Sequence, residues 1–122
     1  MDTELQIETA ILKYLNGLPE VFAIKFSQAS YSRKNTFRPA ANGVADLIVN
    51  LNYRQMMWTC YMEVKKAKGQ LRDTQKAFQV KIWGLKGKYF VVRSVEDVKE
   101  SLGKLRDMAD AYIDKIEEGY KF

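Results

Sequence analysis

Residues 43–65 read GVADLIVNLNYRQMMWTCYMEVK, and this stretch decides the fold that we expect. Its two ends, 43–51 and 56–65, are rich in β-branched, aliphatic and aromatic residues, and a short polar connection near residues 52–55 separates them. Two such runs joined by a short polar segment are typical of neighbouring strands. We therefore predict an antiparallel hairpin.

Charged side chains interrupt both predicted strands. Asp46 interrupts the first strand, and Glu63 and Lys65 share one face of the second, because strand side chains alternate. The hairpin could bring Asp46 beside Glu63, where two carboxylates repel each other unless a positive group lies between them. Oxygen ligands suit Mg²⁺ or Mn²⁺, and Lys65 adds a cation at the rim. Taken singly, Asp46 is more simply a strand-edge residue, and Glu63 with Lys65 a solvated salt bridge.

The elements on either side of the hairpin predict one α/β domain over residues 1–122. Their order is α-β-β-β-α-β followed by a helical C-terminal segment. The predicted elements are a helix from the Thr3–Gln6 capping box to Asn16-Gly17, a strand at 20–27, a loop at 28–43, the hairpin, a helix at about 72–84, a strand at 88–94, a short helix from near Val95, and a final amphipathic helix marked by Leu105 to Ile116.

Two further polar residues fall on apolar helix faces. Glu8 shares the apolar face of the first helix, and Gln75 lies four residues after Leu71 on the stripe of the helix at 72–84. Each has a simple structural interpretation, as a partly exposed flank or as a satisfied polar residue at the edge of the core. Together with the charged hairpin residues, they favour a site, since a buried carboxylate needs a partner.

The composition excludes several kinds of chemistry. The chain has no histidine, so a histidine general base and a histidine-ligated zinc are impossible. Cys60 is the single cysteine, which excludes intrachain disulfides and thiolate cages. No apolar run approaches the roughly 18 residues of a membrane helix, and the N-terminal residues lack the pattern of a signal peptide. We expect a soluble protein of the cytoplasm.

The net charge of +5 is concentrated in the middle of the chain. Residues 63–93 hold nine basic and two acidic residues, and residues 27–62 hold four and one. This asymmetry favours a polyanionic partner such as DNA, although a charge run alone is more simply a solvated surface. Tyr31 and Phe37 could stack on bases or anchor their loop. The candidate DNA contacts are Arg33, Lys34, Arg38, Lys66, Lys68, Arg72 and Lys76.

The order of these residues resembles that of a known nuclease family. Gly43-x-x-Asp46, then Glu63-x-Lys65, then Gly69 and Gln75, resembles the PD-(D/E)XK nuclease superfamily. The similarity is closer to its VRR-NUC branch, the virus-type replication-repair nucleases, whose small members occur in bacteriophages. It covers roughly residues 5–95, and Arg72 stands where a Ser or Thr helix cap is usual. The resemblance implies an αβββαβ core with a mixed central sheet flanked by helices, plus a C-terminal helix.

The resemblance also implies roles for the site residues. Asp46, Glu63 and the carbonyl group of Val64 would hold Mg²⁺ or Mn²⁺, and Glu8 would complete the shell through water or a second ion. Such a site hydrolyses phosphodiesters without histidine, because the metal lowers the pKa of water and neutralises developing charge.

Two more catalytic residues follow from the same resemblance. Lys65 would orient the attacking water or stabilise the transition state, and Gln75 would position Lys65 or the scissile phosphate.

The function expected from this resemblance is structure-selective, metal-dependent DNA cleavage. Family members of this size are similar to Holliday-junction resolvases in forming homodimers, so we expect a homodimer acting on four-way junctions in replication, recombination or repair. Its compartment would be the bacterial host cytoplasm if the chain is phage-encoded. The alternative is a nuclease-like accessory module that binds DNA without cleaving it. A purely structural dimerisation module would leave the basic block unexplained.

Overall fold

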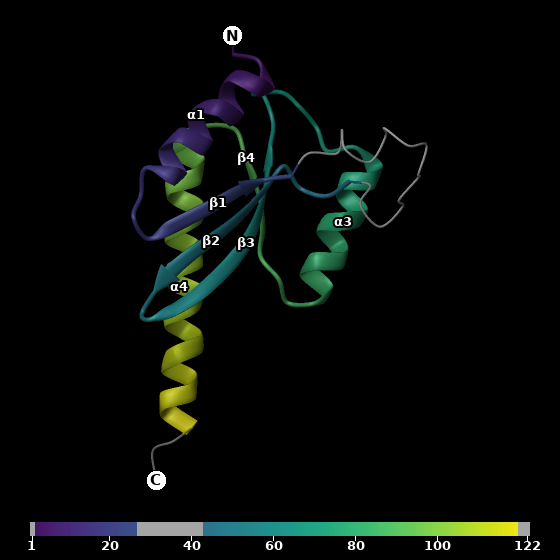
Figure 1. The fold of residues 1–122 in the computed structure, drawn as a ribbon. Coiled ribbons are helices and arrows are strands. Elements are labelled where there is room, and N and C mark those ends of the chain that lie inside the picture. Colours follow the sequence, from purple (N-terminus) through teal and green to yellow (C-terminus); the bar gives the residue numbers. More distant parts are fainter. Residues whose placement is uncertain (1, 27–42, 120–122) are drawn as a thin grey trace, which may run out of the picture.

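The computed structural model describes residues 2–26 and 43–119, which form an α/β fold around a four-stranded sheet (Figure 1). The strands lie in the order β1-β2-β3-β4; β1, β2 and β3 pair antiparallel, and β3 and β4 pair parallel. The mixed sheet flanked by helices and the C-terminal helix therefore agree with expectation. The elements are α1 (Glu4–Asn16), β1 (Val21–Lys25), β2 (Leu47–Tyr53), β3 (Met56–Val64), α3 (Asp73–Gly84), β4 (Tyr89–Val92) and α4 (Val95–Gly119).

The predicted hairpin is confirmed as β2 and β3. Its two-residue turn consists of Arg54 and Gln55, which both adopt positive φ angles of 53° and 64°. Positive φ at both central residues matches the right-handed twist of a tight hairpin. The turn sets the register, in which Leu47 pairs with Met62. This register decides which side chains face each other at the far end of the hairpin.

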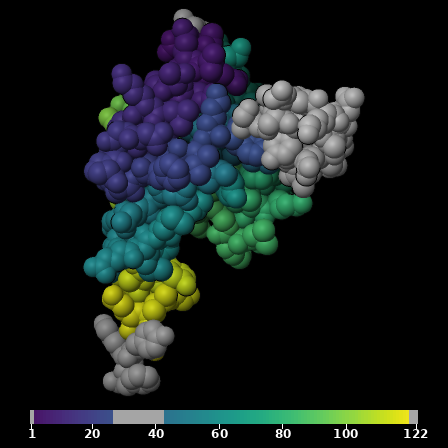
Figure 2. Space-filling view, in the orientation of Figure 1, coloured from purple at the N-terminus to yellow at the C-terminus, as the bar shows by residue number. Residues whose placement is uncertain are grey.

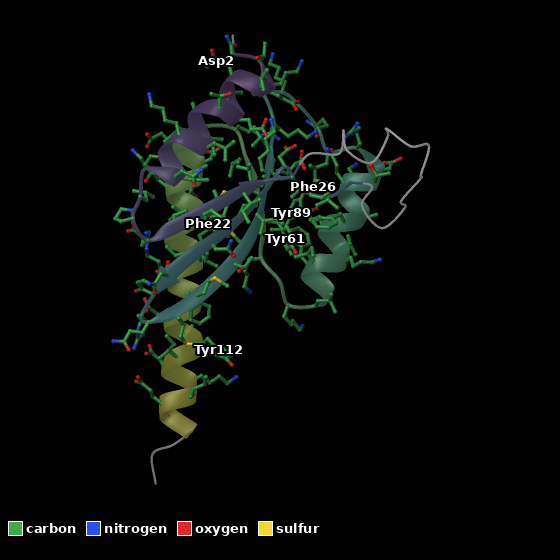
Figure 3. All side chains as sticks on the ribbon, viewed as in Figure 1. Asp2, Phe22, Phe26, Tyr61, Tyr89 and Tyr112 are labelled. Atoms are coloured by element: carbon green, nitrogen blue, oxygen red, sulfur yellow. The ribbon has the colours of Figure 1, made fainter. Side chains whose placement is uncertain are left out.

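The hydrophobic core lies between one face of the sheet and the helices α1 and α4. Ile11 and Leu15 of α1 and Leu102 of α4 are buried in one cluster with the strand residues. The opposite face is partly covered by α3, where the Tyr61 and Phe78 rings meet edge to face at 5.2 Å. Tyr61 and Tyr89 come from the neighbouring strands β3 and β4 and lie on the side of α3 (Figure 3).

The C-terminal segment differs from the expectation of two helices. It forms one continuous helix of 25 residues, α4. The buried residues Val98, Leu102, Leu105 and Ala109 follow one helical stripe without interruption, so packing against the sheet carries the helix through Gly103. The last turns of α4 project beyond the sheet (Figures 1 and 2).

Over residues 2–26 and 43–119, no helix is both long enough and apolar enough to cross a membrane.

Candidate active site

The hairpin places Asp46 and Glu63 opposite each other at the open end of β2 and β3. Asp46 directly precedes Leu47, and Glu63 directly follows Met62, its partner in the ladder. The Glu63 side chain is 2% exposed, and its Oε1 atom has no hydrogen-bond partner among the described residues. A buried, unpaired carboxylate oxygen is costly, so this atom requires a proton or a cation.

Burial and the neighbouring carboxylate disfavour the charged form of Glu63. Desolvation is the largest cause, and the neighbouring Asp46 carboxylate adds to it; together they raise the pKa of Glu63 to about 9. The Lys65 ammonium group acts in the opposite direction and lowers this pKa. Two carboxylates that compete for one proton in a buried position form a strong cation site once a cation replaces that proton.

Val64 connects the two carboxylates through its backbone. The Val64 N–H group donates a hydrogen bond of 2.8 Å to Asp46 Oδ2. In a strand, the N–H and C=O groups of one residue point to the same side, so the Val64 carbonyl is directed toward the Asp46 side of β3. The residues therefore fit a hard divalent cation, because two carboxylates and a carbonyl are oxygen ligands and one oxygen is unsatisfied.

Lys65 lies deeper in the protein than the sequence suggested. The residue is only 6% exposed, and its Nζ atom is 3.8 Å from Glu63 Oε2. The predicted sharing of a face with Glu63 is confirmed, whereas the position at the rim is wrong. The Glu63 carboxyl group thus lies beside the buried Lys65 amino group.

Gln75 joins the helix α3 to the carboxylate pair. Its Oε1 atom accepts a hydrogen bond of 2.8 Å from the backbone N–H of Arg72, and its Nε2 atom donates one of 3.2 Å to Glu63 Oε2. The first bond satisfies a backbone N–H at the helix start, where the Arg72 side chain makes no cap bond. Gln75 is buried and contacts Glu63, so the polar residue on the apolar stripe belongs to the site.

Gly43, in the segment that precedes β2, lies close to the backbone at the start of α3. Its φ angle is +81°, and an added Cβ atom would meet the carbonyl oxygen of Thr74. A side chain there would collide with the backbone of α3 and adopt a strained conformation. The glycine of the Gly43-x-x-Asp46 pattern therefore permits the close approach of the start of α3 to the segment that leads into Asp46.

Helix α1 presents two acids toward this region. Glu8 is largely buried and pairs with Lys25 of β1 at 3.3 Å, and its described contacts do not include the Asp46–Glu63 pair. Glu4, one turn earlier, raises the pKa of Glu63 through its charge. Sequence analysis missed Glu4; its spacing of four residues from Glu8, on the same helix face, was the available signal.

The described basic residues surround the site on the α3 side. Lys66, Lys68, Arg72 and Lys76 are all exposed. Arg93 was not among the predicted residues, yet its Nη1 atom donates hydrogen bonds to the carbonyl oxygens of Lys66 and Gly69 at 2.7 and 2.8 Å. It thereby holds the segment that follows Lys65. Arg33, Lys34 and Arg38, like Tyr31 and Phe37, lie outside the described residues.

The structure brings together four of the predicted catalytic residues, namely Asp46, Glu63, Lys65 and Gln75. Among the described cysteine, aspartate and glutamate side chains, no group of three is placed to hold a metal ion. Oxygen ligands beyond the Asp46–Glu63 pair would therefore come from the backbone or from water. No family model, curated protein or solved structure matches this chain.

Proposed function

We propose that this protein is a divalent-metal-dependent DNA endonuclease of the PD-(D/E)XK type, similar to the VRR-NUC branch. The observation that carries the proposal is the pair of half-buried Asp46 and buried Glu63, with one unsatisfied Glu63 oxygen and Lys65 beside it. The two carboxylates and the Val64 carbonyl would hold Mg²⁺ or Mn²⁺, which would supply an activated water and neutralise charge on the phosphate.

The chain's own residues prepare this chemistry. Asp46 is oriented by the Val64 N–H group, and Glu63 is oriented by Gln75, so both carboxylates are fixed before a cation binds. Lys65 holds a positive charge beside Glu63, where it can donate a hydrogen bond to the attacking water or to a phosphate oxygen. Gln75 acts as a positioning residue, because it contacts Glu63 and the start of α3.

The basic surface supports DNA as the substrate. Exposed Lys66, Lys68, Arg72 and Lys76 lie on the segment between β3 and the first turn of α3, next to the carboxylates that they would serve. Lysine and arginine side chains grip phosphates regardless of sequence. We infer that DNA geometry, rather than base sequence, selects the substrate.

A homodimer acting on four-way junctions is part of the proposal. In the C-terminal half of α4, Met108, Tyr112 and Ile116 are 39–55% exposed and continue the buried stripe of the helix. Lys86 and Lys88 line a hollow with Met108, and Glu118 lies near the end of α4. Two antiparallel copies of this surface would bury the apolar residues and bring opposite charges together.

The experiment that tests the catalytic proposal is cleavage of supercoiled plasmid, flap, splayed and four-way DNA by the full chain with Mg²⁺, Mn²⁺ or EDTA. Cleavage with the divalent ions and none with EDTA supports the proposal. DNA binding without cleavage under every condition would instead favour the accessory DNA-binding module. The Glu63→Gln variant, purified in parallel, shows whether a contaminating nuclease causes the signal.

A further inference from the structure

A concave site lies beside α3, where its lining residue Val91 is one strand away from Glu63. It is a pocket of about 460 Å³ between α3, the edge strand β4 and the segment before α3. Its lining residues are Gln70, Leu71, Lys76, Gln79, Val80, Val91 and Arg93. Its volume lies within the range that small organic ligands occupy, which is roughly 300 to 1,000 Å³.

The pocket combines three kinds of chemistry. Lys76 and Arg93 supply positive charge, and none of the seven lining residues is acidic. Gln70 and Gln79 supply amide groups that both donate and accept hydrogen bonds. Leu71, Val80 and Val91 supply apolar surface. A nucleotide has the matching parts, namely a phosphate, a base edge with donors and acceptors, and an apolar base face.

The sheet register connects the pocket to the carboxylate pair. Val91 is the partner of Glu63 in the parallel ladder between β3 and β4, so both side chains lie on the same face, one strand apart. On α3, Gln75 contacts Glu63 while the next residue, Lys76, lines the pocket. A DNA strand that crosses the start of α3 can therefore place one phosphate at Glu63 and an adjacent nucleotide in the pocket.

We propose that this pocket binds an unpaired nucleotide of the DNA strand next to the cleaved phosphate. The proposal rests on the proposed function and specifies its substrate. In duplex DNA the bases are paired and stacked. A duplex can therefore offer phosphates to Lys76, but it cannot offer a free base to the glutamine amides and the apolar side chains of the pocket. DNA with an unpaired segment satisfies all three parts of the pocket. The pocket thus gives the site its preference for branched or frayed DNA.

The direct test is a titration of the isotope-labelled full chain with a single-stranded octathymidylate in EDTA, followed by nuclear magnetic resonance. We expect chemical-shift changes at the Gln79 side-chain amide and at the methyl groups of Val80 and Val91. Changes confined to exposed Lys66, Lys68 and Arg72 would overturn the proposal. So would equal changes with an acidic peptide of the same charge, because they would show attraction by charge alone.

A variant test separates base binding from phosphate attraction. Gln79→Glu places a carboxylate in the pocket without changing side-chain size, and Gln55→Glu makes the same change in the distant hairpin turn. We expect Gln79→Glu to weaken binding of a duplex with an unpaired tail about fivefold or more, and of a blunt duplex less than twofold. Equal losses for both DNAs would contradict the proposal. Arg93 is unsuitable for this test because it also holds the Lys66–Gly69 segment.

The two proposals fail in distinguishable ways, because binding is measured without metal. Shifts in the pocket without cleavage of any DNA would retain the pocket and reject the endonuclease. Cleavage without shifts in the pocket would retain the endonuclease and reject the pocket.

Discussion

The Asp46 carboxylate accepts a hydrogen bond of 2.8 Å from the backbone N–H of Val64. This bond continues the pairing of β2 and β3 beyond their last ladder residues and fixes Asp46 opposite Glu63. At the end of the ladder, the Asp46 side chain thus accepts the hydrogen bond that a backbone carbonyl would otherwise accept. The carboxylate pair is consequently built into the hairpin and does not depend on a surface loop for its position.

Asp46→Asn and Glu63→Gln are each expected to lower the rate of DNA cleavage by at least about a thousandfold, because each removes a charged metal ligand. Affinity for DNA in EDTA should stay equal or rise with Asp46→Asn, which removes a carboxylate near the phosphates, and stay equal with Glu63→Gln, because the pKa of Glu63 is raised to about 9 and its carboxyl group is already protonated near neutral pH. Single-turnover cleavage and fluorescence anisotropy in EDTA measure the two quantities. Cleavage at the wild-type rate by both variants at saturating Mg²⁺ would reject the metal site.

Lys65→Met should lower the single-turnover rate about a hundredfold or more and change DNA affinity little, because Lys65 is buried beside Glu63. Lys68→Met is the matched control on the exposed segment. We expect it to weaken DNA binding and to reduce the salt dependence of binding by about one unit, with a smaller effect on the rate. If Lys65→Met altered only the salt dependence, its catalytic role would be wrong.

Much of this arrangement could be predicted from the sequence, because it depends on local patterns. Alternation along 56–65 indicated that Glu63 and Lys65 share a face, and the short connection at 52–55 indicated the hairpin. The burial of Lys65 could not be predicted, since it depends on tertiary packing around the end of β3. The role of Arg93 was missed for the same reason: its hydrogen bonds join segments 24 and 27 residues apart.

Without metal, the stability of the protein should fall as the pH rises. Glu63 has a pKa of about 9 in the folded chain and an ordinary value of 4.5, so the folded state binds the proton more tightly. Between these values, the free energy of unfolding decreases with pH, by at most about 1.4 kcal/mol per unit from this group. Its stabilising effect is complete below about pH 4.5 and is lost above about pH 9.

The contribution of Glu63 to this slope can be isolated by substitution. Glu63→Gln should flatten the dependence and raise the stability of the metal-free protein near neutral pH, whereas Glu118→Gln at an exposed position should leave the slope unchanged. Denaturant titrations in EDTA across the pH range measure both effects. Identical slopes for wild type and Glu63→Gln would show that the carboxyl group ionises normally.

Gly43→Ala should destabilise the protein by about 2–4 kcal/mol, because the added methyl group meets the Thr74 carbonyl and φ is +81°. Gly103→Ala makes the same substitution at a glycine where the added methyl group has space, so it serves as the control. Gly103 lies within α4 with no atom near a built Cβ, so alanine there should stabilise by up to about 1 kcal/mol. Urea denaturation followed by circular dichroism gives both values. A neutral Gly43→Ala would mean that the start of α3 can move away from β2.

The last prediction concerns the exposed part of α4. Tyr112 packs edge to face on Trp58 at 6.0 Å yet remains 55% exposed, at the centre of the surface proposed to pair with a second copy. Tyr112→Glu should convert a dimer into a monomer, because two carboxylates would face each other across a two-fold axis. Phe22→Glu makes the same kind of change at an exposed aromatic residue of β1 and should leave the dimer intact (Figure 3). Light scattering at micromolar concentration measures the mass.

The wild-type dimer should nick a four-way junction faster than a linear duplex of equal length, and the Tyr112→Glu monomer should lose this preference while still nicking DNA. A monomeric wild-type protein on DNA, or equal wild-type rates on junction and duplex, would leave only a general metal-dependent nuclease.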